Sequence, residues 1–197
     1  MKTQGFCLLV CFLITTSLFG QDSSLDLGVD FNVARINHQK QAMLALGGWA
    51  MTNIGVSAAL RGRHSGAEKY FHDMNIYWNV VNLGIAGLGY YTAMRENPEA
   101  YSAFTTAAKH YSFQKVLLFN AGLDIGYMLG GLYLTERAKR GGERADQLKG
   151  FGKSVILQGG FLFAFDLVNY YISSRADDKL EILLSATGNG LGLSFIF

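Results

Sequence analysis

The sequence predicts a mainly α-helical membrane protein, a four-helix transmembrane bundle with a short N-terminal strand and a C-terminal β-hairpin. Charged residues make up only 16% of the 197 residues, against about 25% in a typical soluble domain. The helix expected over 72–93 is apolar except for a narrow polar stripe. A surface helix in water has the reverse pattern, so this helix is expected to turn its polar face toward partner helices and its apolar face toward lipid.

Residues 1–20 have the layout of a secretory signal peptide. Lys2 precedes a long apolar run, and Gly20 supplies a small residue for cleavage. The alternative is an uncleaved anchor helix, for which the apolar run is short. Because Cys7 and Cys11 both lie in this segment, the mature chain, a single membrane domain over 21–197, is expected to lack disulfides and cysteine metal sites.

Two segments with strand character flank the helices. Residues 25–33 alternate apolar and polar side chains, a period of two that is typical of a half-buried strand. The tail over 181–197 contains Asn189-Gly190 between two apolar runs, which is a strong hairpin signal. We expect these elements to form a small three-stranded sheet outside the membrane. A final phenylalanine on an alternating strand is also typical of outer-membrane barrels, but one hairpin cannot close a barrel.

Four long apolar segments lie between these ends, at about 41–60, 72–93, 114–135 and 151–173. Each is close to the roughly 20 residues that a helix needs to cross a bilayer. The first segment carries no charged residue, and Asp124 is the only one over 116–134. A water-soluble bundle would need Lys, Glu or Arg on its outer faces, so these segments favour a membrane.

The charged residues lie mainly in the connections. Three Lys or Arg residues fall in 61–70 and five in 136–149, whereas 94–112 contains two. By the positive-inside rule, the connections over 61–70 and 136–149 are expected to face the cytoplasm and both mature termini the periplasm. This places the protein in a cell-envelope membrane, the inner one. Within 94–112, Asn97 is a good N-cap and Pro98 suits the first helical position, so a short interfacial helix is expected there.

Polar side chains line one face of each apolar segment. Four of them, between His72 and Asn82, fall within about 80° of arc on one helical face. The other three segments carry similar inward-facing polar groups. The candidates for a polar core, or for an ion or ligand site, are His72, Asn75, Asn79, Asn82, Asn53, Asn120, Asp124, Gln158, Asp166 and Asn169.

Two interpretations of these polar residues stay open. Asn and Asp side chains hydrogen-bond across membrane helices for about 0.6 kcal/mol each, so the core could be structural. An ionisable residue at membrane depth costs about 2.5–3.5 kcal/mol or more and by default marks a functional site. Asp124 and Asp166 are such residues, and no Arg or Lys lies at the same depth as a partner. We favour the structural interpretation because amides outnumber charges.

Gly122, Gly126 and Gly130 are spaced four apart on the third segment. Such glycines form a smooth ridge on which another helix can approach closely. The ridge points about 140° away from the face of Asn120 and Asp124. We therefore expect it to face lipid and to form a homodimer, with another helix of the same chain as the alternative occupant.

No enzymatic or nucleic-acid-binding motif is found in the sequence. The four histidines lack the i, i+4 spacing of metal ligands, and no Walker loop, dinucleotide fingerprint or G-x-S-x-G is present. The net charge of +2 argues against nucleic acid. We expect a partnership with the lipid bilayer but no catalytic residue, metal or cofactor. The remaining enzymatic alternative is a membrane-embedded hydrolase that uses Asp124 and Asp166.

Three stretches carry a family resemblance: FHDMNIYWNVVNLGIAGLG, LFNAGLDIGYMLGGLYL and LQGGFLFAFDLVNYY, preceded by a signal segment that ends in LFGQ. With these stretches the chain resembles an uncharacterised family of signal-peptide-bearing, four-helix membrane proteins of Bacteroidota. The resemblance implies the architecture and no assigned activity. The leading hypothesis is a non-enzymatic scaffold or accessory subunit with a hydrogen-bonded polar core. The alternative is a small transport or proton- or cation-linked protein that uses buried Asp124 and Asp166.

Overall fold

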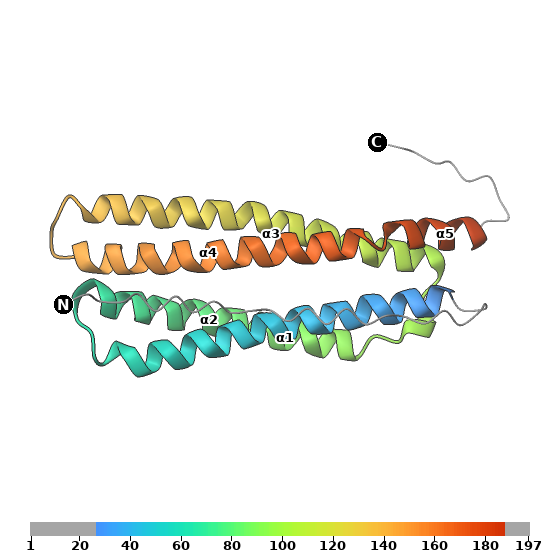
Figure 1. The fold of residues 1–197 in the computed structure, drawn as a ribbon, viewed down its shortest axis with the longest axis horizontal. Coiled ribbons are helices and arrows are strands. Elements are labelled where there is room, and N and C mark those ends of the chain that lie inside the picture. The colour runs from blue at the N-terminus through green and yellow to red at the C-terminus, as the bar shows by residue number, and fades with distance from the viewer. Residues whose placement is uncertain (1–26, 188–197) are drawn as a thin grey trace, which may run out of the picture.

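The computed structural model describes residues 27–187, and every regular element in that range is a helix. The elements are α1 (Leu27–Arg61), α2 (Gly66–Met94), the short 3-10 helix η1 (Pro98–Ala100), α3 (Ala103–Ala138), α4 (Ala145–Ser174) and α5 (Asp177–Thr187). The four long helices lie lengthwise beside one another (Figure 1). α1 pairs with α2 and α3 with α4, and α2 packs against α4 to join the two hairpins. The predicted four-helix architecture is confirmed; the expected signal segment over 1–20 lies outside the described residues.

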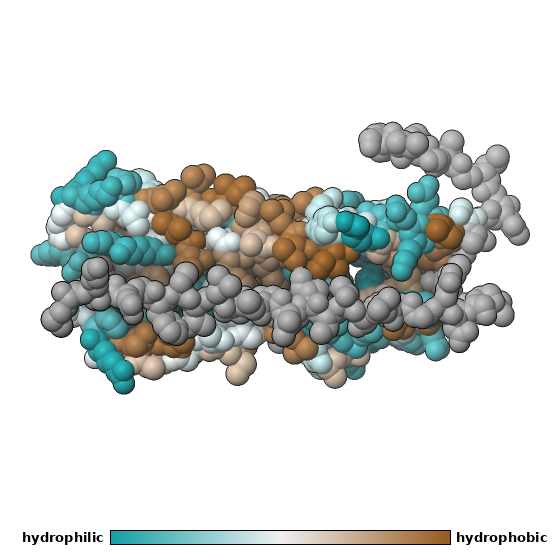
Figure 2. Space-filling model, viewed as in Figure 1, coloured by the Kyte–Doolittle hydropathy of each residue, from teal (hydrophilic) through white to brown (hydrophobic). Residues whose placement is uncertain are grey.

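Three helices, α1, α3 and α4, are long and apolar enough to cross a membrane. The remaining long helix of the described residues, α2, carries a row of buried polar residues and is not apolar enough to be included with these three. The outer surfaces are oily: Phe119, Leu129 and Tyr133 of α3 are all more than half exposed. Figure 2 shows apolar side chains concentrated over the middle of the bundle and hydrophilic side chains toward its ends. These features indicate a membrane location.

The core of the bundle has the opposite character to its surface. In the described part of the chain, buried polar and charged residues outnumber buried hydrophobic ones. Many of the buried apolar residues are alanines, such as Ala50, Ala86 and Ala121. Small side chains let helix backbones approach closely, so that short polar side chains reach across to the next helix.

Three glycines set the closest helix contacts. A Cβ atom added to Gly131 of α3 would lie 2.7 Å from the carbonyl oxygen of Gly152 of α4, and one added to Gly152 would lie 2.6 Å from that of Gly131. A Cβ on Gly150 would collide with the carbonyl oxygen of Ala67 on α2. These positions bring α4 against both α3 and α2, which fixes which polar faces meet.

The expected N-terminal strand over 25–33 is wrong for the residues that the structure describes. From Leu27 the chain is already helical, and the amide of Asn32 donates to the carbonyl oxygen of Gly28 one turn earlier. The buried positions 31, 32, 35 and 36 follow a helical spacing. A short run of alternating residues is compatible with either structure, and contacts with distant segments select the helix here.

The predicted hairpin over 181–197 is also wrong where it can be compared. Residues 181–187 belong to α5, while the remainder, with Asn189-Gly190, lies outside the described residues. The three-stranded sheet is therefore not formed in the described part of the chain. Leu180 and Leu183 of α5 are buried against Phe31 and Ala107, so tertiary packing of one apolar face stabilises a helix at this position.

All four long helices extend beyond the predicted spans. α1 and α3 have 35 and 36 residues, so each is more than 50 Å long at about 1.5 Å per residue. The predicted cap at Asn97 is confirmed, because its side chain accepts from the backbone N–H of Glu99, with Pro98 in the first helical turn. The expected interfacial helix is not separate: after η1, its residues form the beginning of α3. We call this end of the bundle, residues 27–40, 96–113 and 175–187, the helical cap.

Candidate polar core and comparison with known proteins

The side chain of Asn75 on α2 is the centre of the polar core. Its Oδ1 accepts from Nε2 of Gln158 at 2.7 Å and from Oγ of Ser154 at 2.9 Å, both on α4. Its Nδ2 lies 3.2 Å from Oγ of Ser57 and 3.3 Å from Oδ1 of Asn53, both on α1. A primary amide has two donor hydrogens and one oxygen with two lone pairs, so Asn75 uses its full capacity. One residue thereby joins three helices.

Gln158 extends this network to the outer edge of α1. Its Nε2 also donates to Oδ1 of Asn53 at 3.4 Å, and its Oε1 accepts from the indole N–H of Trp49 at 2.9 Å. The Trp49 ring stacks on Phe161 with ring centroids 3.8 Å apart. Gln158 is fully buried, and both ends of its amide have protein partners. We call the seven residues Trp49, Asn53, Ser57, Asn75, Ser154, Gln158 and His72 the amide network.

His72 closes the amide network at the end near the α1–α2 turn. Its Nδ1 lies 3.3 Å from Oγ of Ser57, and its ring is 5.3 Å from that of His64. The neighbouring Asp73 points elsewhere and forms a 2.7 Å ion pair with Arg61 at the end of α1. The two adjacent residues therefore do not form a common site.

Asn79 and Asn82 continue the buried stripe on α2 but form no side-chain hydrogen bond to another helix in the described part of the chain. The amide of Asn79 donates to the carbonyl oxygen of Asn75 on the same helix at 2.8 Å, and that of Asn82 approaches Oδ1 of Asn79 at 3.5 Å. Both residues are buried. They belong to the polar face of α2, but their bonds stay within that helix.

Asp124 of α3 and Asp166 of α4 face one another across the contact between these helices. The residues are 2% and 5% exposed, and their carboxyl groups lie within hydrogen-bonding range of each other. A carboxylate can only accept, so a hydrogen bond between the two requires a proton on one of them. Oδ2 of Asp124 is buried and receives no hydrogen bond from any donor among the described residues. This carboxyl pair is chemically suited to hold a proton or another cation.

The remaining candidates lie apart from both groups. Asn169 sits one turn further along α4, where its Oδ1 is 3.0 Å from Nε2 of His38 and its amide bonds the carbonyl oxygen of Phe165. Asn120 is only half-buried and makes no hydrogen bond to another candidate in the described part of the chain. The ten candidates thus divide into the amide network, the carboxyl pair and separate positions.

The helical cap contains a buried ionic cluster that the sequence analysis missed. Arg35 of α1, with a side chain only 3% exposed, forms a 2.7 Å ion pair with Glu96, and Lys109 approaches the same carboxylate at 3.6 Å. The Arg35 guanidinium also contacts Oδ1 of Asn32, whose amide donates to Thr106 of α3 at 2.9 Å. The spacing of Asn32 and Arg35, three residues apart, is compatible with one polar face of a helix and could have indicated this cluster. The prediction of a strand over 25–33 excluded that interpretation.

The charge of Glu96 is held by this cluster. Burial alone would raise the pKa of Glu96, but the hydrogen bond and positive charge of Arg35, with the charge of Lys109, outweigh it and hold the pKa below the ordinary value of 4.5. Glu96 is therefore ionised at neutral pH and fixes the α2–α3 connection to α1.

A second cluster fixes α5. Nε2 of His110 and Nε2 of Gln114, one turn apart on α3, each lie 2.7 Å from Oδ1 of Asp177 in the first turn of α5. The ring of His110 is nearly fully buried and packs edge-on against Phe31. The helical cap is thus built from specific long-range polar contacts.

No group of three or more His, Cys, Asp or Glu side chains suited to a metal ion occurs among residues 27–187. The described residues thus form a hydrogen-bonded amide network and a separate buried carboxyl pair.

Comparison with protein families gives one match, and no curated protein or solved structure matches the chain. A family of unknown function, DUF6992, matches residues 45–167. The matched range contains the amide network and the carboxyl pair, whereas most of the helical cap lies outside it. Because the match covers more than half of the sequence, the chain belongs to DUF6992, a family of unknown function.

Proposed function

We propose that this protein is a non-enzymatic integral membrane protein, a scaffold or accessory subunit whose polar core holds four helices in a fixed arrangement. The observation that carries this proposal is the saturation of the amide network. Asn75 makes four side-chain hydrogen bonds, and both ends of the Gln158 amide have partners on α1 or α2. A ligand would have to displace these bonds, so the network serves packing.

The arrangement of the helices supports a four-pass topology with both mature termini in the periplasm. The α1–α2 and α3–α4 turns lie at one end of the bundle, and η1 and α5 lie at the other (Figure 1). If α1, α3 and α4 cross the bilayer, α2 is carried across beside them. Together the two turns, counted over 61–70 and 136–149, hold eight Lys and Arg residues, against five in the helical cap, which favours the cytoplasmic side for the turns and the inner membrane for the protein. The helical cap then projects into the periplasm.

A scaffold or subunit is expected to occur in an assembly larger than itself. Membranes that contain the epitope-tagged full chain would be solubilised in mild detergent and separated by native electrophoresis beside the purified chain. The proposal predicts that the membrane-derived protein migrates in a larger assembly. Identical migration of the two samples would contradict it.

The carboxyl pair supports a second candidate, a proton- or cation-linked function. Two buried carboxyl groups in contact, with one oxygen of Asp124 lacking a donor, can gain or lose a charge without rearrangement of the amide network. Exchange of a proton or monovalent cation at this pair would couple it to the membrane potential.

Proteoliposomes distinguish the two candidates. Proton or sodium flux driven by a membrane potential would be measured for the full chain and for the Asp124→Asn and Asp166→Asn variants, with Asp73→Asn as a control for a buried acid outside the pair. Flux that both pair variants abolish and the control retains would support the second candidate. Absence of flux in the wild type, with all variants folded, would leave the scaffold proposal in place.

A further inference from the structure

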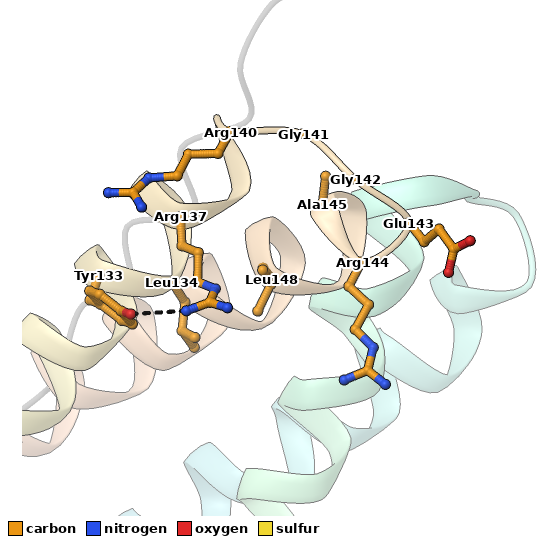
Figure 3. Close-up of a pocket in the computed structure, with 10 residues that line it drawn as sticks. All are labelled: Tyr133, Leu134, Arg137, Arg140, Gly141, Gly142, Glu143, Arg144, Ala145 and Leu148. Atoms are coloured by element: carbon orange, nitrogen blue, oxygen red, sulfur yellow. Dashed lines mark hydrogen bonds between the residues drawn. The ribbon is translucent and has the colours of Figure 1, made fainter.

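A basic pocket lies at the turn between α3 and α4, with a volume of about 690 Å³. The end of α3 contributes Tyr133 and Arg137, the turn contributes Arg140, and α4 contributes its N-cap Arg144 and Leu148. Figure 3 shows Arg137 and Arg144 on either side of Leu148, with Arg140 reaching outward from the end of α3. A second, smaller cavity shares Tyr133, Arg137 and Arg140.

The three arginines have no carboxylate partner among the described residues. Arg137 donates to the hydroxyl of Tyr133 at 3.2 Å, which leaves its charge uncompensated. The nearby Lys139 is already paired with Glu136 at 2.6 Å. Glu143 also borders the pocket but extends away from Arg137 and Arg140 (Figure 3). The pocket therefore presents several guanidinium groups, which favour bidentate binding of a phosphate.

The backbone of the turn adds to this positive field. Gly141 and Gly142 adopt positive φ values of 76° and 104°, which lets the chain reverse sharply between the two helices. α4 then begins at the edge of the pocket, and no side chain caps its N-terminus. The first N–H groups of a helix carry a partial positive charge, so they reinforce the arginines.

The pocket also has an apolar side next to the oily surface of the bundle. Leu134 and Leu148 line it together with Tyr133, which is 61% exposed, and the preceding residue of α3, Leu132, is 50% exposed. Tyrosine is enriched where the acyl region of a membrane meets the headgroups. Arg137 thus lies one helical turn beyond Tyr133, next to the apolar surface, where an arginine that binds a lipid phosphate is expected.

We propose that the basic pocket binds a phosphate group, and that this phosphate belongs to the headgroup of an anionic phospholipid. The arginines bind the phosphate, while the acyl chains lie along the apolar surface of α3. A lipid at this position ties the α3–α4 turn to the membrane surface. Free phosphate offers the same anion without the acyl chains, so the two sources are separable.

The test is a calorimetric titration of the full chain in neutral detergent with short-chain phosphatidylglycerol, phosphatidylcholine and inorganic phosphate. We expect phosphatidylglycerol to bind at least tenfold more tightly than either of the others, with an affinity that falls as salt increases. The double variant Arg137→Gln/Arg144→Gln should bind phosphatidylglycerol about 30-fold more weakly, since each basic residue at a lipid surface contributes about fivefold.

The matched control is Arg63→Gln/Lys69→Gln, which removes the same charge at the neighbouring turn; both of these residues are exposed and without an ion pair in the described structure. The affinity of this control for phosphatidylglycerol should stay within about twofold of that of the wild type. Circular dichroism should show equal helicity for all variants. Equal weakening in both double variants would show a diffuse charge effect and overturn the proposal. Tight binding of inorganic phosphate in place of phosphatidylglycerol would overturn the lipid source. Salt-independent binding would overturn the role of the arginines even if the double variant did not fold.

Discussion

At the scale of single residues, Asn75 shows how one amide side chain can join several helices of a bundle. Its two donors and its oxygen contact α1 and α4, so one side chain links three helices. Lipid offers no competing hydrogen bonds, and each partner left unsatisfied would remain buried. The number of partners, more than burial, therefore decides which polar residue matters most.

Replacing Asn75 with Leu should lower thermal stability in detergent more than replacing Asn82. Asn75→Leu leaves the Ser154 hydroxyl without its acceptor and the Gln158 amide with only the 3.4 Å contact to Asn53, at about 1–3 kcal/mol for each uncompensated group. Asn82→Leu is the matched control, because Asn82 makes only a 3.5 Å contact within its own helix. The measurement is the midpoint of thermal unfolding. Equal midpoints for the two variants would contradict the central role of Asn75.

In the helical cap, Glu96 is the residue that joins several elements, because it pairs with both Arg35 of α1 and Lys109 of α3. Its pKa is lower in the folded protein than the ordinary 4.5, so its ionised form contributes stability above that pH. This contribution is lost as the pH falls from about 4.5 through the lowered folded value. We expect Glu96→Gln to reduce the free energy of unfolding by about 1.5–3 kcal/mol at pH 7. Thermal unfolding should show this difference from the wild type narrowing below about pH 4.5; a constant difference would argue against the ion pair with Arg35.

At the scale of helices, close approach decides which polar faces meet. Gly131 and Gly152 leave no space for a Cβ atom where α3 contacts α4, and the main-chain oxygen of Asp124 lies 3.1 Å from the position of a Cβ on Gly159. The carboxyl pair lies in this same contact. The glycines thus determine the distance between α3 and α4, and with it the contact between Asp124 and Asp166.

Gly131→Ala and Gly55→Ala should have opposite effects on stability. The new methyl group of Gly131→Ala would meet the backbone of Gly152 at 2.7 Å, an overpacking that typically costs about 1–3 kcal/mol. The added methyl group at Gly55 of α1 meets nothing within 4 Å, and alanine favours the helix by about 1 kcal/mol over glycine. Thermal unfolding of the two variants is the measurement. Destabilisation by Gly55→Ala alone would show that the helix contacts are assigned to the wrong faces.

The helical periodicity was sufficient to predict four helices and the buried stripe of α2, because a 3.6-residue period is a local property. The structure of the segments that form the helical cap was not predictable in the same way. Phe31 is buried by Leu180 and Leu183, about 150 residues later, and a local alternation cannot reveal such a partner. The ion pair of Arg35 and Glu96 was missed for the same reason. Similarly, the sequence placed Asn53, Asn75 and Gln158 on inward faces, but their common network depends on how three helices pack.

At the scale of the whole molecule, the bundle is polar inside and apolar outside over its middle. The exposed apolar residues of α1, α3 and α4 form a surface suited to lipid, and polar residues hydrogen-bond to one another inside the bundle. Hydrogen bonds and close packing, and not hydrophobic burial, are the stabilising interactions that such a molecule has within a bilayer.

We propose that the protein forms a homodimer through the ridge of Gly122, Gly126 and Gly130. Among the described residues, nothing lies within 4 Å of a Cβ added to any of the three, so no helix of the same chain occupies the ridge. Gly126→Leu should convert a dimer to a folded monomer, as measured by light scattering in detergent. Gly48→Leu, at an equally open position on α1, is the matched control and should remain dimeric. A wild type that is monomeric over a wide range of detergent concentrations would contradict the dimer.

The most direct test of the four-pass membrane arrangement is the location of the two ends of the bundle. Reporters that are active on only one side of the membrane would be inserted near Gly141, in the α3–α4 turn, and fused after Phe197. We predict activity only in the cytoplasm for the first position and only in the periplasm for the second. Cytoplasmic activity at both positions would contradict the four-pass arrangement and the lipid-facing assignment of the bundle's outer surface.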